Sequence, residues 1–404
     1  MRAEKNGGKG AEKKEGSRFA LTRSRAVLFI VLLGVTSLFG DMTYEGARSI
    51  AGPYLGLFGA TAVVIGVVSG LGEFVGYAAR LFSGYLSDRT RRYWAIAISG
   101  YAVNLFAVPL LALAGSWQIA ALLLIAERTG RGVRSPVRDA MLSHAASRTG
   151  LGWGFGLHQA LDQTGAVLGP LAIAAVLYFG NGYRRGFAVL LLPAAAALSM
   201  LLLARFEFPR PRDFDLSPPP LETAGFAPLF RIYLLAVAFI AAGYADFPLI
   251  AYRFASAKIM PVAFVPLLFA LANGIDGAAG LLLGRLYDRI GIKAMILATA
   301  LSALAAPLVF LGGFKAAALG MAFWGVGMGA QEGVMRAVIA RLAPLDRRAT
   351  AFGLFNAVFG LAWFVGSALL GLLYVYSVVA VAFLSLFLQA SSLPVFFWLL
   401  RKER

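Results

Sequence analysis

Long runs of hydrophobic residues make up most of this chain, and short polar clusters or Gly/Pro turns separate one run from the next. Each run can cross a bilayer, because a membrane helix needs about 20 predominantly apolar residues. Dividing the chain at the polar clusters predicts twelve spans, at residues 26–57, 62–86, 93–114, 117–140, 152–179, 186–204, 228–255, 260–286, 293–312, 316–340, 350–374 and 378–400.

The longest connection between spans, residues 205–227, contains the triplet Pro218-Pro219-Pro220 and predicts a stiff, solvated cytoplasmic linker. It separates two six-helix halves, residues 26–204 and 228–404. Residues 1–25 are rich in Lys, Gly and Glu and are expected to form a disordered, basic cytoplasmic tail. The apolar run that follows is too long for a signal-peptide core and lacks a small-residue cleavage site, so we interpret it as an uncleaved first span.

Composition agrees with an all-α polytopic membrane protein. Hydrophobic residues make up 59% of the 404 residues and charged residues only 14%, whereas globular domains carry about 25% charged residues. The chain has no Cys and two His, which excludes disulfides, thiolate chemistry and a His-rich metal centre. It also has no Gly-x4-Gly-Lys-Ser/Thr loop for ATP. We therefore expect no enzyme, no cofactor and no metal.

The net charge of +17 has two interpretations, nucleic-acid binding and membrane topology. Most Lys and Arg residues lie in the N-terminal tail, in alternate loops, in the linker and at the C-terminus. The other loops hold Arg184, Arg185, Lys258 and Lys315. Cytoplasmic loops of membrane proteins are the positive ones. The asymmetry predicts a multi-pass protein of the plasma membrane with both termini in the cytoplasm, and makes a nucleic-acid partner unnecessary.

Motifs of the first half recur in the second. The run Gly84-Tyr-Leu-Ser-Asp-Arg89 has a counterpart in Gly284-Arg-Leu-Tyr-Asp-Arg289, and Phe155-Gly-Leu157 has one in Phe352-Gly-Leu354. Matching motifs in matching spans predict two pseudo-symmetric halves. Such symmetry is typical of secondary transporters, whose site lies between the halves near the bilayer midplane.

With these motifs the chain resembles the major facilitator superfamily over essentially its whole length after residue 25. The family's signature between spans 2 and 3 is Gly-x-x-x-Asp-Arg/Lys-x-Gly-Arg/Lys-Arg/Lys; the first copy here has Arg91 in place of the usual Gly, and the second keeps Gly291. The resemblance implies the twelve-helix fold of that family and a gate that latches the cytoplasmic helix ends. We assign to this gate Gly84, Asp88, Arg89, Arg92, Arg138, Asp139, Gly284, Asp288 and Arg289, with ordinary loop charges as the alternative.

Two further signatures match in part. Proton-antiporter branches of the family carry Gly-x8-Gly-x3-Gly-Pro in span 5, which Gly156, Gly165, Gly169 and Pro170 match without the trailing glycines. The match favours export by antiport, and close helix packing is the alternative. In span 4, Leu124 stands where the family's usual arginine aligns. The Arg-rich span 4 and the Asp-x-x-x-Glu of span 1 resemble a prokaryotic branch of poorly defined substrate.

Ionisable residues inside the spans are functional candidates, since each costs roughly 2.5–3.5 kcal/mol in the bilayer. Helical spacing places Asp41, Glu45 and Arg48 on one stripe of span 1. In span 4, Glu127 and Arg131 fall on one stripe and can pair directly. The candidates for coupling or substrate binding are Asp41, Glu45, Arg48, Glu73, Glu127, Arg131, Arg134, His158, Asp162, Asp246 and Asp276.

The charged residues of the span-4 stripe are expected at two different depths in the membrane. Glu127, Arg131 and Arg134 run from mid-membrane inward and could face the cavity, whereas Arg138 and Asp139 belong at the cytoplasmic end. Arg128 projects from another side of the helix. Most of these charges lie in the first half, so we infer that coupling chemistry sits there and that the second half shapes the cavity.

Two interpretations of the charges compete. They fix helix packing as salt bridges, or some carboxylates take up and release a proton as an arginine moves away or returns. The second predicts a monomeric secondary transporter of an unidentified small molecule, driven by the proton gradient through alternating access and leaning to export. The alternatives are a proton-coupled importer or uniporter of a small organic anion held by Arg131 and Arg134, and a non-transporting sensor or assembly partner.

Overall fold

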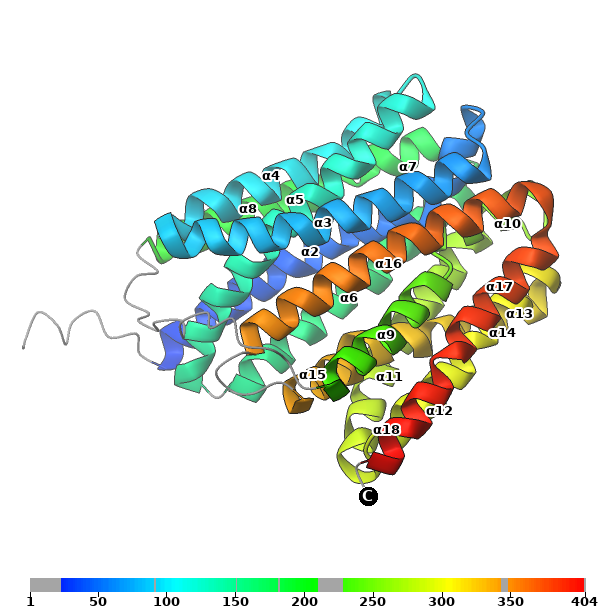
Figure 1. Cartoon of the computed structure of the whole chain (residues 1–404). Coiled ribbons are helices and arrows are strands. Elements are labelled where there is room, and N and C mark those ends of the chain that lie inside the picture. The colour runs from blue at the N-terminus through cyan, green and yellow to red at the C-terminus, as the bar shows by residue number, and fades with distance from the viewer. Residues whose placement is uncertain are drawn as a thin grey trace, which may run out of the picture.

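The computed structural model describes residues 23–90, 92–149, 151–180, 182–209, 228–342 and 348–402, and every regular element within these ranges is helical (Figure 1). Nearly all of the predicted tail and most of the predicted linker lie outside these ranges. The first half contains α2 (Arg23–Leu57), α3 (Ala62–Thr90), α4 (Tyr93–Leu110), η1 (Leu111–Leu113), α5 (Trp117–Thr149), α6 (Leu151–Tyr178), α7 (Tyr183–Val189) and α8 (Leu191–Glu207).

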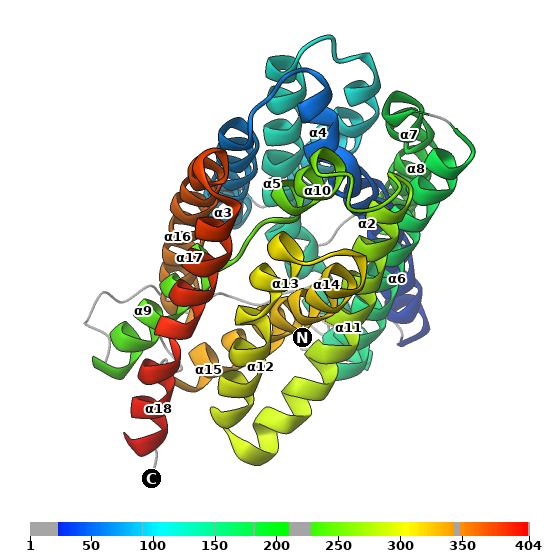
Figure 2. The ribbon, with the colours of Figure 1, turned by 90° about the vertical axis from the view of Figure 1, so that its right-hand side faces the viewer.

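The second half repeats this order with more interruptions. It contains α9 (Pro228–Gly243), α10 (Phe247–Ser256), α11 (Phe264–Ile290), α12 (Lys293–Ala303), α13 (Ala305–Leu311), α14 (Phe314–Gly329), the π-helical η3 (Ala330–Val334), α15 (Met335–Leu342), α16 (Arg348–Tyr376), α17 (Val378–Ser391) and α18 (Leu393–Lys402). Several short helices join end to end. The paired elements α7–α8, α9–α10, α12–α13 and α17–α18 each form one interrupted rod (Figures 1 and 2).

Within the described residues, ten rods are long and apolar enough to cross a membrane. The two remaining rods, α5 and α14–η3–α15, make the arrangement consistent with the expected twelve spans. Many large apolar side chains point outward from the rods, including Phe82, Leu122, Phe206, Leu281 and Phe387. Such a surface suits lipid. The structure is therefore an all-α, multi-pass membrane protein.

The rods alternate in direction, so α2 begins on the same face of the molecule where α18 ends. We call this the terminal face, and the opposite face, where α2 and α10 end, the distal face. In Figure 1 the two halves draw together towards α10 and separate towards the described termini. Three helix pairs form the main contacts between the halves: α2 with α10, α3 with α16, and α6 with α11.

Close packing near the distal face depends on glycine. A Cβ at Gly70 would lie 2.9 Å from the Cα of Phe364, and one at Gly52 would meet the backbone of Pro248. Small residues let helix backbones approach in this way. The distal ends of the two halves therefore meet backbone to backbone.

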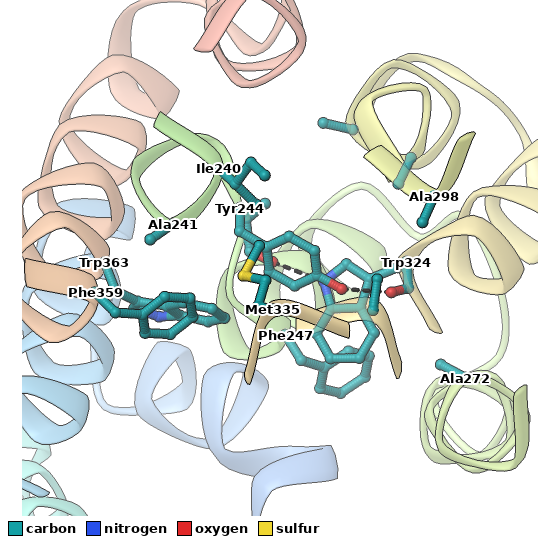
Figure 3. Packing of buried hydrophobic residues seen from close by; sticks show 14 of the residues in the cluster. Ile240, Ala241, Tyr244, Phe247, Ala272, Ala298, Trp324, Met335, Phe359 and Trp363 are labelled. Atoms are coloured by element: carbon teal, nitrogen blue, oxygen red, sulfur yellow. Dashed lines mark hydrogen bonds between the residues drawn. The ribbon is translucent and has the colours of Figure 1, made fainter. Parts of the chain in front are cut away.

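A buried aromatic cluster fixes the interruption between α9 and α10. The Tyr244 hydroxyl donates to the carbonyl of Trp324, and the Trp324 indole donates to the carbonyl of Ala245 at 2.9 Å (Figure 3). The Phe247 and Phe269 rings stack with centroids 3.9 Å apart. The indole bond satisfies a carbonyl that the broken helix leaves free, and the cluster packs around the residues that precede α10, Asp246 among them.

The span-5 glycines differ in what they contact. Gly165 and Gly169 face the backbone of α2, and a Cβ at Gly169 would lie 2.9 Å from the nitrogen of Gly46. A Cβ at Gly156 would meet nothing within 4 Å. Gly165 and Gly169 therefore pack α6 against α2, whereas Gly156 has no such role.

These contacts predict different costs for two matched substitutions. Gly169→Ala should lower the free energy of unfolding by about 1–3 kcal/mol, since an added methyl overpacks the interface. Gly156→Ala should be neutral or slightly stabilising, because Ala is the better helix former. Thermal unfolding of both purified variants in detergent measures the difference. Equal melting temperatures would contradict this account of the α2–α6 contact.

Candidate functional site

A cavity of about 100 Å³ lies between the two halves. Both halves line it, and most lining side chains are charged, amide-bearing or aromatic: Asp41, Glu45, Arg48, Glu73, Tyr77, Arg80, Arg131, Asp162, Gln163, Asn273, Asp276, Gln331, Glu332, Arg336, Phe355, Phe359 and Trp363. Seven of the candidates from the sequence thus surround one space. Glu127, Arg134, His158 and Asp246 do not line it.

Arg48 joins the two halves at the distal end of the cavity. Its Nη2 donates to Oδ1 of Asp246 at 2.7 Å, and its Nη1 lies 3.8 Å from Oε2 of Glu45, one turn away on α2. Arg48 is 6% exposed and Asp246 2%. Asp246 also caps α10 by accepting a hydrogen bond from the Phe247 backbone N–H at 2.8 Å. Helix interruption and ion pair therefore depend on the same carboxylate.

Asp41 and Arg134 form a second buried pair within the first half. Nη2 of Arg134 lies 3.2 Å from Oδ1 of Asp41, and the guanidinium sits 4.5 Å from the ring centroid of Tyr101. Arg134 is 1% exposed. Arg134 was expected to face the cavity; instead it supports Asp41 from behind, and Asp41 itself lines the cavity.

Glu127 and Arg131 do not form the ion pair expected from their spacing. Glu127 lies 3.5 Å from Nε of Arg128 and accepts a hydrogen bond from Asn104 at 2.7 Å. Arg128 also donates to Glu73 of α3. Arg131 instead places its guanidinium 4.0 Å from the ring centroid of Tyr44. Spacing along α5 did not give these partners, because the neighbouring helices supply them.

Arg128 is a buried member of this charge network that the candidates from the sequence do not include. It connects two carboxylates on different helices and lies 8% exposed. One sequence signal could have found it. Gly72 and Gly76, spaced as a small-x-x-x-small pair on α3, leave room for it, since a Cβ at Gly72 would lie 3.1 Å from the Arg128 Cγ.

Arg138 connects a gate candidate with a coupling candidate. Its guanidinium lies 2.8 Å from Asp139, donates to the hydroxyl of Ser37 at 3.0 Å and lies 3.8 Å from Asp162. The Ser37 hydroxyl is also 3.0 Å from Nε2 of His158. Two gate candidates of α5, Arg138 and Asp139, therefore lie in one cluster with the coupling candidates Asp162 and His158 of α6.

The second half contributes carboxylates of another kind. Asp276 on α11 is 8% exposed and lines the cavity, but it forms no ion pair with any residue that the structure describes. One turn earlier, Asn273 donates to the carbonyl of Ala166 at 2.9 Å and accepts from Gln163 with its own carbonyl. These bonds hold α11 against α6 beside the cavity.

The repeated loop motifs lie at the terminal-face ends of α3 and α11. Arg89 donates to the hydroxyl of Tyr85 at 3.3 Å, and Arg92, Asp288 and Arg289 are exposed. The side chain of Asp88 lies outside the described part of the structure. A Cβ at Gly84 would make ordinary contact with Pro136 at 3.8 Å, and one at Gly284 would meet nothing within 4 Å. The gate assignment remains a prediction.

The chain is similar to known proteins over most of its length. A family model described as Major Facilitator Superfamily matches residues 27–367 and 247–404. A Mycobacterium tuberculosis protein described as uncharacterized is 40% identical over 391 residues, covering 94% of this chain and 95% of that protein. An uncharacterized MFS-type transporter of Methanocaldococcus jannaschii is 29% identical over 365 residues, covering 85% and 88%. The crystal structure of the nucleoside transporter NupG matches with a TM-score of 0.73 at 11% identity, covering 92% of this chain and 99% of that one.

Replacing Arg128 should lower the stability of the protein strongly, and replacing Glu73 as well should restore part of the loss. Arg128→Gln removes the partner of Glu73 and one partner of Glu127. We expect the free energy of unfolding to fall by about 3–5 kcal/mol, the usual cost of stranding a buried charge. Adding Glu73→Gln should recover part of that loss. Unfolding in mixed micelles measures Arg128→Gln, Glu73→Gln and the double variant, and strictly additive losses would show that the two residues do not interact.

Removing the Arg48–Asp246 bond should make the contact between the halves at the distal face more accessible. Asp246→Asn keeps a good helix cap but removes the ionic bond between the halves. The reporter is Ala51→Cys, a buried position on α2 near Pro248. Asp246→Asn should raise the rate at which maleimide labels this cysteine by about tenfold, because it shifts the opening equilibrium by about 1.4 kcal/mol. Glu207→Gln, on the surface of α8, is the control. An unchanged rate would mean that this bond does not hold the distal face closed.

Proposed function

This chain belongs to the major facilitator superfamily, and we propose that it is a proton-coupled secondary transporter of small molecules that works by alternating access. One observation carries the proposal. The cavity is lined by buried acidic and basic side chains of both halves, and a buried ion pair between the halves closes its distal end. A site between two repeated halves is where secondary transporters bind their substrates.

We propose that the terminal face is cytoplasmic, in the plasma membrane, because the Lys- and Arg-rich segments belong to that face. The cavity then faces the cytoplasm in this conformation. Glu332 and Arg336, which line it nearest the terminal face, are exposed, whereas Arg48 and Asp246 at its distal end are buried. The protein acts as a monomer, since one chain supplies both halves of the site.

Partner exchange at Arg48 gives a route to the other conformation. Opening the distal face must break the 2.7 Å bond to Asp246, and an arginine left buried without a partner would cost several kcal/mol. Glu45, at 3.8 Å on the same helix, stays beside Arg48 when the halves separate. Arg48 therefore keeps a counter-charge in both states, which lowers the barrier between them.

Proton coupling follows the same logic within the first half. Asp41, Glu73 and Asp162 line the cavity, and each lies beside one arginine: Arg134, Arg128 and Arg138 respectively. An arginine at that distance favours the ionised carboxylate, and burial favours the neutral one. Movement of a pair during transport would switch the preference and bind or release a proton. We propose export by antiport as the direction, following the partial glycine signature of span 5.

A second candidate function is import or uniport of a small organic anion. Arg80 and Arg131 favour it, because both line the cavity and neither forms an ion pair within the described ranges. Uniport of an anion carries no obligatory proton, whereas proton-coupled import differs from the first candidate in the direction in which substrate and proton move.

Proton flux in proteoliposomes tests the proposal. Compounds that raise the melting temperature of the purified protein would be added outside vesicles that contain a pH-sensitive dye. We expect substrate-dependent flux that Asp41→Asn or Glu73→Gln lowers at least about tenfold, because an amide cannot take up a proton in place of a carboxylate. Glu207→Gln should retain the flux. Substrate movement without proton flux would favour uniport, and no movement of any stabilising compound would contradict transport.

A further inference from the structure

Five charged residues of the cavity lack an ion-pair partner among the residues described. Three are basic, Arg80, Arg131 and Arg336, and two are acidic, Asp276 and Glu332. The other acids that line the cavity each have an arginine within 4 Å. Free charges of both signs around one space suit a ligand that carries both signs.

The three arginines gather from different helices. Arg80 is on α3, Arg131 on α5 and Arg336 on α15, and both of the others interact electrostatically with Arg80. Aromatic rings hold two of them in place: Arg80 lies 4.9 Å from the centroid of Tyr77, and Arg131 lies 4.0 Å from that of Tyr44. The buried Nε of Arg80 has no hydrogen-bond partner. A bound anionic group would relieve their mutual repulsion and supply that partner.

Two uncharged side chains of the cavity also have polar atoms without a hydrogen-bond partner. Gln331, 6% exposed in the π-helical η3, leaves both its amide nitrogen and its amide oxygen without a partner. Trp363, 4% exposed, leaves its indole nitrogen without one. Both side chains line the cavity with Asp276. Buried polar atoms are normally hydrogen-bonded, so these atoms indicate a site built for a polar ligand.

An aromatic surface accompanies these groups. The rings of Phe359 and Trp363 lie side by side on α16, with centroids 5.4 Å apart, and the Tyr244 ring lies 5.3 Å from that of Trp363 (Figure 3). Aromatic faces attract ammonium groups. A carboxylate and an aromatic surface in one cavity favour an ammonium ligand over a neutral one.

We propose that the substrate is a small zwitterion that bridges the two halves. Its anionic group binds to Arg80, Arg131 and Arg336, and its ammonium group binds to Asp276 beside Trp363. Asp276 lies closer to the distal end of its helix than Arg80 does to the distal end of its own, by roughly 9 Å at about 1.5 Å per residue, so Asp276 is the deeper of the two when seen from the terminal face. The ligand therefore enters from the terminal face with its ammonium group leading. The inference rests on the proposed transport function and specifies its substrate class.

A matched ligand series tests the charge requirement directly. The purified full chain in detergent is titrated by calorimetry with 6-aminohexanoate, hexanoate and hexylamine at constant ionic strength. The zwitterion should bind at least about tenfold more tightly than either singly charged analogue, because each analogue leaves one set of site charges unpaired. The 4-aminobutyrate and 8-aminooctanoate homologues bracket the charge separation, and the affinity should depend on length.

Two variants test which residues bind each end of the ligand. Asp276→Asn should lower the affinity for 6-aminohexanoate to that for hexanoate, and leave hexanoate binding unchanged. Arg131→Gln should lower it to that for hexylamine, and leave hexylamine binding unchanged. The retained binding of one analogue shows that each variant is folded. Glu207→Gln and Arg205→Gln, both on α8 away from the cavity, are the charge-matched controls and should bind all three ligands as the parent does.

Three results would overturn the proposal: equal binding of hexanoate and the zwitterion, equal binding of hexylamine and the zwitterion, or no binding of any member of the series at tens of millimolar. Equal binding would mean a simple anion site or a simple cation site. Selective binding of the zwitterion without counterflow in proteoliposomes would support the site and contradict the proposed transport function instead.

Discussion

The bond from Arg48 to Asp246 is the interaction on which the rest of this structure depends. It crosses between the halves at 2.7 Å, and both side chains are almost fully buried. Breaking such a pair is costly, because it leaves a buried charge without its partner. Asp246 sits at an interruption between two helices that an aromatic cluster fixes, and Gly52 lets α2 approach α10 at the same level. Backbone, aromatic packing and charge thus meet at one contact that closes the distal face.

The two halves use charge differently. In the first half, arginines on α5 neutralise acids on α2, α3 and α6, so the carboxylates are held within a network of pairs. In the second half, Asp276 and Glu332 face the cavity without such partners in the described structure. The sequence had placed the coupling chemistry in the first half because charges are more numerous there. We propose a division in which the paired acids respond to conformation and the unpaired groups respond to the substrate.

The architecture could be predicted because the bilayer dictates the length of each hydrophobic run and the linker separates the halves. Stripes such as Asp41, Glu45 and Arg48 could also be predicted, since helical spacing fixes which residues share a face. Partners on other helices could not be predicted. Helical phase gives the direction of a side chain but not the helix that lies in that direction, so Arg128 was missed and Glu127 was paired with Arg131. The interruption at Asp246 carries a local signal, an Asp N-cap followed by Pro248 in the first turn, which the division of the chain by hydropathy did not use.

Distances between spin labels on the two faces would test alternating access most directly, and the absence of Cys makes site-specific labelling simple. One pair would join Leu57 to Ser256 across the distal face, and another would join Thr90 to Ile290 across the terminal face. In lipid, a change of pH or substrate should shift the populations so that one distance lengthens as the other shortens. If neither distance changes under any condition, the protein does not work by alternating access.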